Sequence, residues 1–336
     1  MNGRWRAAIV FLAGLAMAGL AAAQMMRPPA FAGGIPGMAQ FQAIQMQRHQ
    51  ARTLLYREAL EELRRNPAAA DVPECAAGQG AAGSQCLARA EQAGAAAAER
   101  PQRRLAVLIG NNAYAAPIPP LETPIADVSQ IAGVLQGRFG FETVVVKDAG
   151  KAKIIEALNK VAAEARPDDS VLLFYAGHGY LLDDVNMGYW IPVDASVKTA
   201  QGWISNSDIS KLLSAIRARQ LILVSDSCYS GSLTREQKVA PGRELAPEEI
   251  LKRRSVLVLS SGADEPVSDE GKEGHSIFAW NQIKTLQGTG GLAPGVQVWS
   301  SVRSGVSREY PQQPQYGAVV SAGHAEGGDF LFRAQR

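Results

Sequence analysis

The chain has 336 residues, of which 34 are Lys or Arg and 32 are Asp or Glu, so its formal net charge at pH 7 is +2. This balance gives no reason to expect binding to nucleic acid or to an anionic membrane surface. The length is sufficient for a large buried core and allows one or two domains. The order of the residues is more informative than their overall composition.

The N-terminus has the three parts of an export signal. Arg4 and Arg6 precede an apolar run at residues 7–20, and three alanines follow the run. This pattern predicts a signal peptide at residues 1–23, cleaved at an A-x-A site. The alternative is an uncleaved anchor, but the apolar run is short for a membrane span. We therefore expect an exported protein, either periplasmic or secreted, with no stable membrane anchor after cleavage.

Residues 24–102 are expected to form an N-terminal helix and a low-complexity linker rich in Ala, Gly and Pro. Within it, the pattern at 38–65 predicts one helix that ends before Pro67. The apolar stripe of this helix is weak, so docking on the main domain or a partner and a semi-ordered spacer are equally good interpretations. The following Ala- and Gly-rich stretch is typical of a linker.

The sequence contains three cysteines: Cys75, Cys86 and Cys228. In an exported protein, Cys75 and Cys86 are close enough in sequence to form a local disulfide within the linker. Cys228 would then be the unpaired thiol. Three cysteines and four histidines form no recognisable metal motif, so we expect no metal site.

From residue 103 the sequence alternates between buried strands and amphipathic helices. Apolar runs bounded by turn residues predict strands at 105–110, 141–146, 170–175, 220–225, 255–260 and 328–332. Helical spacing of apolar residues predicts helices at 124–136, 154–165, 207–218 and 275–286. The alternation predicts one α/β domain at 103–336, a three-layer sandwich in which helices flank a central, mostly parallel sheet of about six strands.

Two of these strands lead directly into reactive side chains. The strand at 170–175 precedes His178, and the strand at 220–225 precedes Cys228. Functional residues of open α/β sheets gather at the carboxyl ends of the strands. If the two strands are neighbours, the His178 imidazole and the Cys228 thiol emerge together. A thiol beside an imidazole is a nucleophile beside its base.

Each of these two residues also has a purely structural interpretation. A lone cysteine is commonly buried and inert, and a histidine at a strand end commonly bonds to backbone. Their occurrence together in two strand-end motifs favours catalysis. In that hypothesis, His178 is the general acid, and the backbone amides of Gly179 and Cys228 are candidates for an oxyanion hole.

The two motifs resemble those of caspase-like cysteine peptidases. Segment 175–179 (YAGHG) carries the histidine, and segment 226–231 (DSCYSG) carries the cysteine 50 positions later, as in caspases. Segments 260–278 and 328–330 resemble the small-subunit region of that family, and the overall pattern is most similar to bacterial metacaspase-like proteins, or orthocaspases. The resemblance covers about residues 103–334. It implies a caspase-like sandwich and a Cys-His dyad that hydrolyses peptide bonds through a thioester.

The resemblance also implies which residues select the substrate. Two acids that shape the pocket for the residue before the scissile bond correspond to Asp127 and Asp226, so we expect protein or peptide substrates cut after Arg or Lys. Asp127 also suits a first helical turn, and Asp226 a turn cap, for structural reasons alone. Caspases proper place an arginine in the first-helix region to bind aspartate, whereas residues 117–136 here contain no Arg or Lys.

A long polar segment at 232–254 interrupts the alternation directly after the cysteine motif. We expect an exposed loop, and such loops inside compact domains are commonly functional or processed. Its basic end, Lys252-Arg253-Arg254, is the best candidate for self-cleavage by an enzyme with basic specificity. A solvated run of charge is the equal alternative.

Three features depart from the metacaspase pattern. Tyr229 stands where many metacaspases have His, and Ala176 replaces a Ser that lines the pocket in some of them. The acidic calcium cluster does not map cleanly: Asp208 corresponds to one member, but Arg235 falls where an acid is expected. We therefore expect no cofactor, with calcium dependence left open.

The leading hypothesis is thus an exported caspase-like cysteine endopeptidase. The alternative is a caspase-fold binding or scaffold module with little or no proteolytic activity, which the N-terminal helix and low-complexity arm would suit. A third hypothesis is another thiol hydrolase or transferase that uses the same dyad. The sequence indicates no oligomeric state.

Overall fold

The computed structural model describes residues 102–182, 187–227, 233–234, 236–239, 246–262 and 271–335. The predicted signal peptide, N-terminal helix, linker and disulfide lie outside these residues, as does Cys228 itself.

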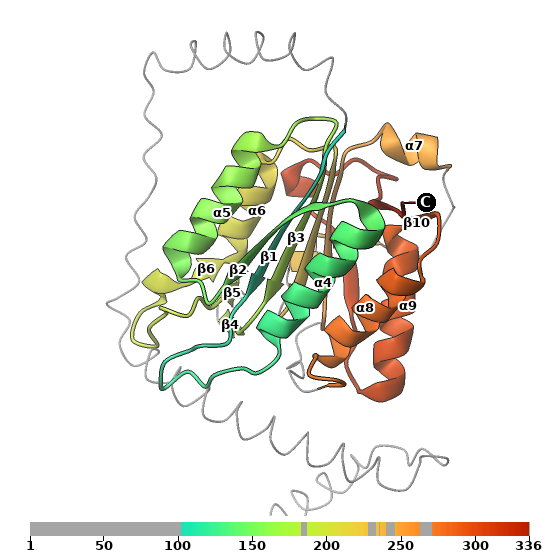
Figure 1. Ribbon diagram of the computed structural model, residues 1–336. Coiled ribbons are helices and arrows are strands. Elements are labelled where there is room, and N and C mark those ends of the chain that lie inside the picture. The colour runs from blue at the N-terminus through green and yellow to red at the C-terminus, as the bar shows by residue number, and fades with distance from the viewer. Residues whose placement is uncertain are drawn as a thin grey trace, which may run out of the picture. The chain divides into compact units, whose positions relative to one another are not determined.

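The centre of the domain is a seven-stranded mixed sheet with the strand order β2-β1-β3-β7-β9-β11-β8 (Figure 1). The first five strands in that order are mutually parallel, and β11 is antiparallel to both of its neighbours. The predicted, mostly parallel central sheet is therefore confirmed. The strands are β1 (Arg104–Gly110), β2 (Glu142–Lys147), β3 (Ser170–Ala176), β7 (Gln220–Asp226), β8 (Gln237–Lys238), β9 (Ser255–Ser260) and β11 (Gln315–Ala318).

Helices cover both faces of this sheet, which makes the predicted three-layer sandwich (Figure 1). One face is covered by α4 (Pro124–Phe139), α8 (Ile277–Gly288) and α9 (Gly295–Glu309). The other face is covered by α5 (Lys151–Glu164) and α6 (Asn206–Ala215). None of the helices in the described part of the chain has the length and apolar content needed to cross a membrane.

The central strands are apolar at nearly every position because both of their faces are buried. In β7, Ile222 and Val224 belong to the core beneath α4, α8 and α9. Leu221 and Leu223 belong to the core beneath α5 and α6. Successive side chains of a strand point to opposite faces, so one strand contributes to both cores.

Three elements differ from the prediction. The strand expected at 328–332 is β12 (Leu331–Arg333), and it pairs with β10 (Leu292–Pro294) in a separate two-stranded sheet. In the central sheet, the place beside β9 is taken instead by β11, which is too short to show a clear alternation of apolar and polar residues. The prediction also omits α9, although its buried residues Val298, Trp299, Val302 and Val306 keep helical spacing.

Two further parts of the chain are more ordered than predicted. The segment 232–254 was expected to be a loop, yet its described parts include β8 and a short helix, α7 (Pro247–Leu251). After His178 the chain forms a second, antiparallel sheet of β4 (Gly179–Leu182), β5 (Met187–Trp190) and β6 (Ile204–Ser205).

One histidine makes the stability of the fold depend on pH. The Val256 N–H donates to Nδ1 of His324 at 3.2 Å, and burial lowers the pKa of this imidazole below its usual 6.5. Protonation of Nδ1 would abolish the hydrogen bond. Because the folded-state pKa is depressed, this stabilisation is present above pH 6.5 and is lost as the pH falls through the folded pKa.

We therefore expect the free energy of unfolding to fall more steeply below pH 6.5 in the wild type than in His324→Asn. The asparagine amide keeps an acceptor near the position of Nδ1 but does not titrate. Urea denaturation of both proteins on either side of that pH checks the prediction. Identical pH dependence in the two proteins would contradict it.

Candidate active site

The two reactive motifs leave the sheet at neighbouring positions. β3 and β7 pair in parallel along their whole length, and the last pair in register is Ala176 with Asp226. One residue further on, the N–H of Gly177 donates to the Asp226 carbonyl at 3.3 Å. The predicted adjacency of the two strands is confirmed. Cys228 follows Ser227, the last described and fully buried residue of this segment.

A backbone carbonyl orients the imidazole of His178. Its Nε2 lies 2.8 Å from the Pro119 carbonyl oxygen, on the loop between β1 and α4. Since a carbonyl oxygen can only accept, Nε2 carries the proton and Nδ1 carries the lone pair that a base needs. The sequence motifs gave no sign of this contact, because a backbone carbonyl has no side-chain signature.

Two buried tyrosines hold the backbone of His178. The Tyr114 hydroxyl accepts from the His178 N–H at 3.0 Å, and the Tyr175 hydroxyl donates to the His178 carbonyl at 2.9 Å. Burial raises the pKa of Tyr114 to about 12, so its hydroxyl stays protonated. That hydroxyl also donates to the Ile191 carbonyl at 2.9 Å. The rings of Tyr114 and His178 are in contact, with centroids 4.6 Å apart.

The two predicted specificity acids are joined through the start of α8. Asp127, in the first turn of α4 and 1% exposed, accepts from Nδ1 of His275 at 2.7 Å and from the Ser276 N–H at 3.3 Å. The Ser276 hydroxyl donates to Asp226 at 2.6 Å. The same hydroxyl accepts from the Ala279 N–H and so caps α8. The structure thus brings Asp127 and Asp226 to one residue.

His275 and Ser276 are the site residues to which the sequence assigned no role. Burial lowers the pKa of His275, and the nearby Glu273 opposes this shift. At neutral pH the imidazole is therefore mostly uncharged and adds little positive charge beside Asp127. A Ser followed by an apolar helix is a recognisable N-cap signal, so the position of Ser276, although not its link to Asp226, could have been found.

The other residues proposed from sequence fall elsewhere. Gly179 begins β4 directly after His178. Asp208 accepts from the Ser205 hydroxyl at the N-terminus of α6, so its carboxylate takes part in a helix cap. Among the described residues, no three His, Cys, Asp or Glu side chains lie close enough together to hold a metal ion. Arg235 and Tyr229 lie outside the described residues.

The basic triplet of the predicted processing segment follows α7. Lys252 is exposed and pairs with Glu249 at 2.7 Å. Arg253 donates to the Glu326 carbonyl at 2.6 Å. The guanidinium of Arg254 donates to three backbone carbonyls, those of Ile216, Ala218 and Ala322.

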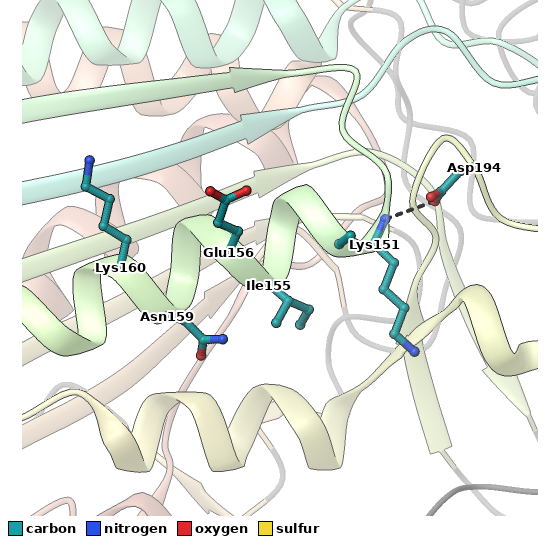
Figure 2. A pocket seen from close by; sticks show the side chains of 7 residues that line it. Lys151, Ile155, Glu156, Asn159, Lys160 and Asp194 are labelled. Atoms are coloured by element: carbon teal, nitrogen blue, oxygen red, sulfur yellow. Dashed lines mark hydrogen bonds between the residues drawn. The ribbon is translucent and has the colours of Figure 1, made fainter.

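A separate open groove of about 1010 Å³ runs along the outer side of α5 (Figure 2). At one end, Asp194 accepts from the Lys151 N–H at 2.9 Å and so caps the helix. None of the residues proposed for catalysis or specificity lines this groove, so it is not the candidate active site. Its lining consists of Lys151, Ala152, Ile155, Glu156, Asn159, Lys160 and Asp194.

Comparison with known proteins agrees with this arrangement. Residues 103–321 match the caspase domain family of peptidases. The chain belongs to this family. Metacaspase-1 of Ajellomyces capsulatus is 29% identical over 150 residues, which cover 39% of this chain and 41% of the relative. The chain thus matches about two fifths of that protein's length.

A solved caspase structure shows the same fold. Caspase-1 from Spodoptera frugiperda aligns with a TM-score of 0.50 and 13% identity, over 70% of this chain and 91% of its own. A Geobacter sulfurreducens protein aligns with a TM-score of 0.47 and 18% identity, over 68% of this chain and 99% of its own. The caspase-like α/β sandwich is therefore established, and membership of the caspase domain family indicates a cysteine peptidase.

The contacts of Gly177 give a test of this site that needs no substrate. A Cβ at this position would lie 2.7 Å from the Tyr114 hydroxyl and 2.8 Å from that of Tyr175. We expect Gly177→Ala to lower the free energy of unfolding by about 1–3 kcal/mol, because at least one tyrosine must move. Chemical denaturation measures the change.

Gly133→Ala is the matched control, because a Cβ at that position in α4 meets nothing within 4 Å. Alanine is the better helix former, so this variant should be as stable as the wild type or more stable by up to about 1 kcal/mol. If Gly177→Ala were no less stable than Gly133→Ala, the tight packing around His178 would be refuted.

Proposed function

We propose that this protein is an exported cysteine endopeptidase that hydrolyses peptide bonds after Arg or Lys. Cys228 is the nucleophile and His178 is the general acid and base. The observation that carries the proposal is the pairing of β3 with β7, which ends at the two motifs, together with the hydrogen bond from His178 to the Pro119 carbonyl. This bond leaves Nδ1 of His178 as the nitrogen that can take a proton.

In the proposed reaction, Nδ1 of His178 takes the proton of the Cys228 thiol. The thiolate attacks the scissile carbonyl carbon, and the resulting oxyanion is stabilised by the backbone amides of Gly179 and Cys228. His178 then donates the proton to the leaving amine, so the amide bond breaks and a thioester remains. Water, deprotonated by the same imidazole, hydrolyses the thioester and restores the thiol.

Selection of a basic side chain is proposed on the basis of the acid pair. Asp127 and Asp226 are both buried and both bonded to Ser276. The adjacent His275 has a lowered pKa and adds little positive charge at neutral pH. A cationic side chain of the substrate would offset the charge of the two carboxylates, whereas an anionic one would be repelled.

Self-processing, if it follows the same specificity, has one favoured position in the triplet 252–254. The Arg254 carbonyl accepts from the Ala325 N–H at 2.9 Å, and Ser255 already begins the buried strand β9. Cleavage after Arg254 would therefore require part of the sheet to open. Lys252 has a largely exposed side chain, so we propose cleavage after this residue.

The proposal is tested with fluorogenic peptides that end in Arg, Lys or Asp, with and without calcium. We expect turnover of the Arg and Lys peptides and its loss by about a thousandfold or more in Cys228→Ala. Asp127→Asn should lower kcat/KM for the Arg peptide by about tenfold or more, because the pocket loses a buried charge.

Asp169→Asn is the matched control for Asp127→Asn. Asp169 is an equally buried acid, but it accepts from Arg103 and Arg166 at the amino end of β3, opposite the site. For the Arg peptide, kcat/KM of the Asp169→Asn variant should stay within about twofold of the wild-type value. Equal losses in the two variants would refute the acid pocket. A folded wild type without Cys228-dependent turnover on any peptide would refute the peptidase and favour the binding module.

A further inference from the structure

Trp190, at the end of β5, packs on one face of the central sheet against the two neighbouring strands that carry the reactive motifs. It is 2% exposed, and its indole ring stacks on the Tyr175 ring with centroids 4.3 Å apart and planes 9° from parallel. β5 belongs to the small sheet β4-β5-β6, so Trp190 links that sheet to the central one. Nothing in the proposed reaction requires a tryptophan at this place.

On one side, Trp190 adjoins the groups that hold His178. The Tyr175 hydroxyl, at the end of the ring on which the indole stacks, donates to the carbonyls of His178 and Ile191 at 2.9 and 3.0 Å. Ile191 directly follows Trp190, and its N–H donates to the His178 carbonyl at 3.0 Å. The His178 backbone is therefore fixed against the backbone of the residue next to Trp190.

On the other side, Trp190 reaches the segment that leads to Cys228. Its Nε1–H donates to the Ser225 hydroxyl at 3.1 Å, and the hydroxyls of Ser225 and Ser227 are 3.0 Å apart. Both serines are buried, and Ser227 is covalently joined to Cys228. A buried indole N–H needs an acceptor, and Ser225 provides it at a strand position where an apolar residue would otherwise be expected.

From these contacts we infer that Trp190 is a positioning residue, which fixes the end of β3 that leads to His178 against the end of β7 that leads to Cys228 by stacking on Tyr175 and donating to Ser225. The inference rests on the proposed function. Proton transfer between a thiol and an imidazole requires the two groups to approach within hydrogen-bond distance. A displacement of about 1 Å in such a pair is enough to reduce the rate by about a hundredfold.

Trp203 provides a matched control. It too is 2% exposed, and its Nε1–H donates to the Ser196 carbonyl at 3.0 Å. It belongs to a different apolar cluster, where it makes edge-on contacts with Tyr180 and Tyr189. Trp203→Phe therefore removes the same kind of indole N–H at the same burial, and it leaves the stack on Tyr175 and the bond to Ser225 intact.

The test follows the pH dependence of Cys228 alkylation by iodoacetamide. Mass spectrometry of the purified full chain after digestion distinguishes the Cys228 peptide from those of Cys75 and Cys86. In the wild type and Trp203→Phe, we expect rapid alkylation to persist well below pH 8, because the imidazole takes the thiol proton. In Trp190→Phe, alkylation at pH 6 should be about tenfold slower or more, with a profile nearer to that of a free thiol of pKa about 8.5.

Ser225→Ala gives the same test from the opposite side, since it removes the acceptor and keeps the ring stack. We expect it to shift the alkylation profile as Trp190→Phe does, and the double variant to add little to either. If the wild type has an imidazole-dependent profile and both single variants retain it, the inference is overturned and the proposed function stands. If the wild type itself reacts as a free thiol, the proposed function is overturned, and the inference with it.

Discussion

The whole site depends on the register between β3 and β7. Residues 170–176 pair one to one with residues 220–226, and every side chain of both strands is buried. A slip of one residue would turn each strand's apolar set toward the wrong core, so the register has no near alternative. The strands therefore end side by side, and the chain leaves the sheet at Gly177 and Ser227 on the same level. The points at which the chain leaves the two strands, just before His178 and Cys228 in the sequence, follow from hydrophobic burial on both faces of the sheet.

At this edge of the sheet, large buried aromatic rings carry polar groups that form hydrogen bonds. Tyr114, Tyr175 and Trp190 combine large buried rings with one donor each, and these donors bond to backbone carbonyls or to a serine. A fully bonded network of this kind is rigid, because moving one member leaves another buried and unbonded. The rings thus fill the core, while their polar ends form hydrogen bonds to the backbone of His178 and Ile191 and to Ser225. This explains how the backbone of His178 is held after the strand ends.

Much of this arrangement could be predicted from the sequence. The strands at 170–175 and 220–225 have strong apolar patterns, and their ends identified His178 and Cys228. The acids Asp127 and Asp226 were assigned from a family resemblance, and the structure brings both to Ser276. Long, doubly buried strands are the elements that hydrophobic pattern predicts best, because tertiary packing reinforces the pattern instead of overriding it.

The remaining features have no sequence signal of sufficient strength. The carbonyl of Pro119 acts through the backbone, which is the same for every residue. β11 has four residues and β8 has two, so neither shows a period. In the sequence, Trp190 has the pattern of an ordinary core residue, and only its three-dimensional neighbours reveal that it contacts both β3 and β7. The described parts of segment 232–254 include a short strand, a short helix and the hydrogen-bonded side chain of Arg254. The polar composition of the segment gave no indication of them.

The central claim is that Cys228 is a nucleophile activated beside His178 and directed to basic substrates. The most direct measurement is the mass of the protein after reaction with a peptidyl chloromethyl ketone that ends in arginine, followed by mapping of the modified residue. The account predicts one inhibitor per chain, bound to Cys228, and much slower labelling in His178→Ala. No adduct on a folded chain, or an adduct confined to Cys75 or Cys86, would contradict it.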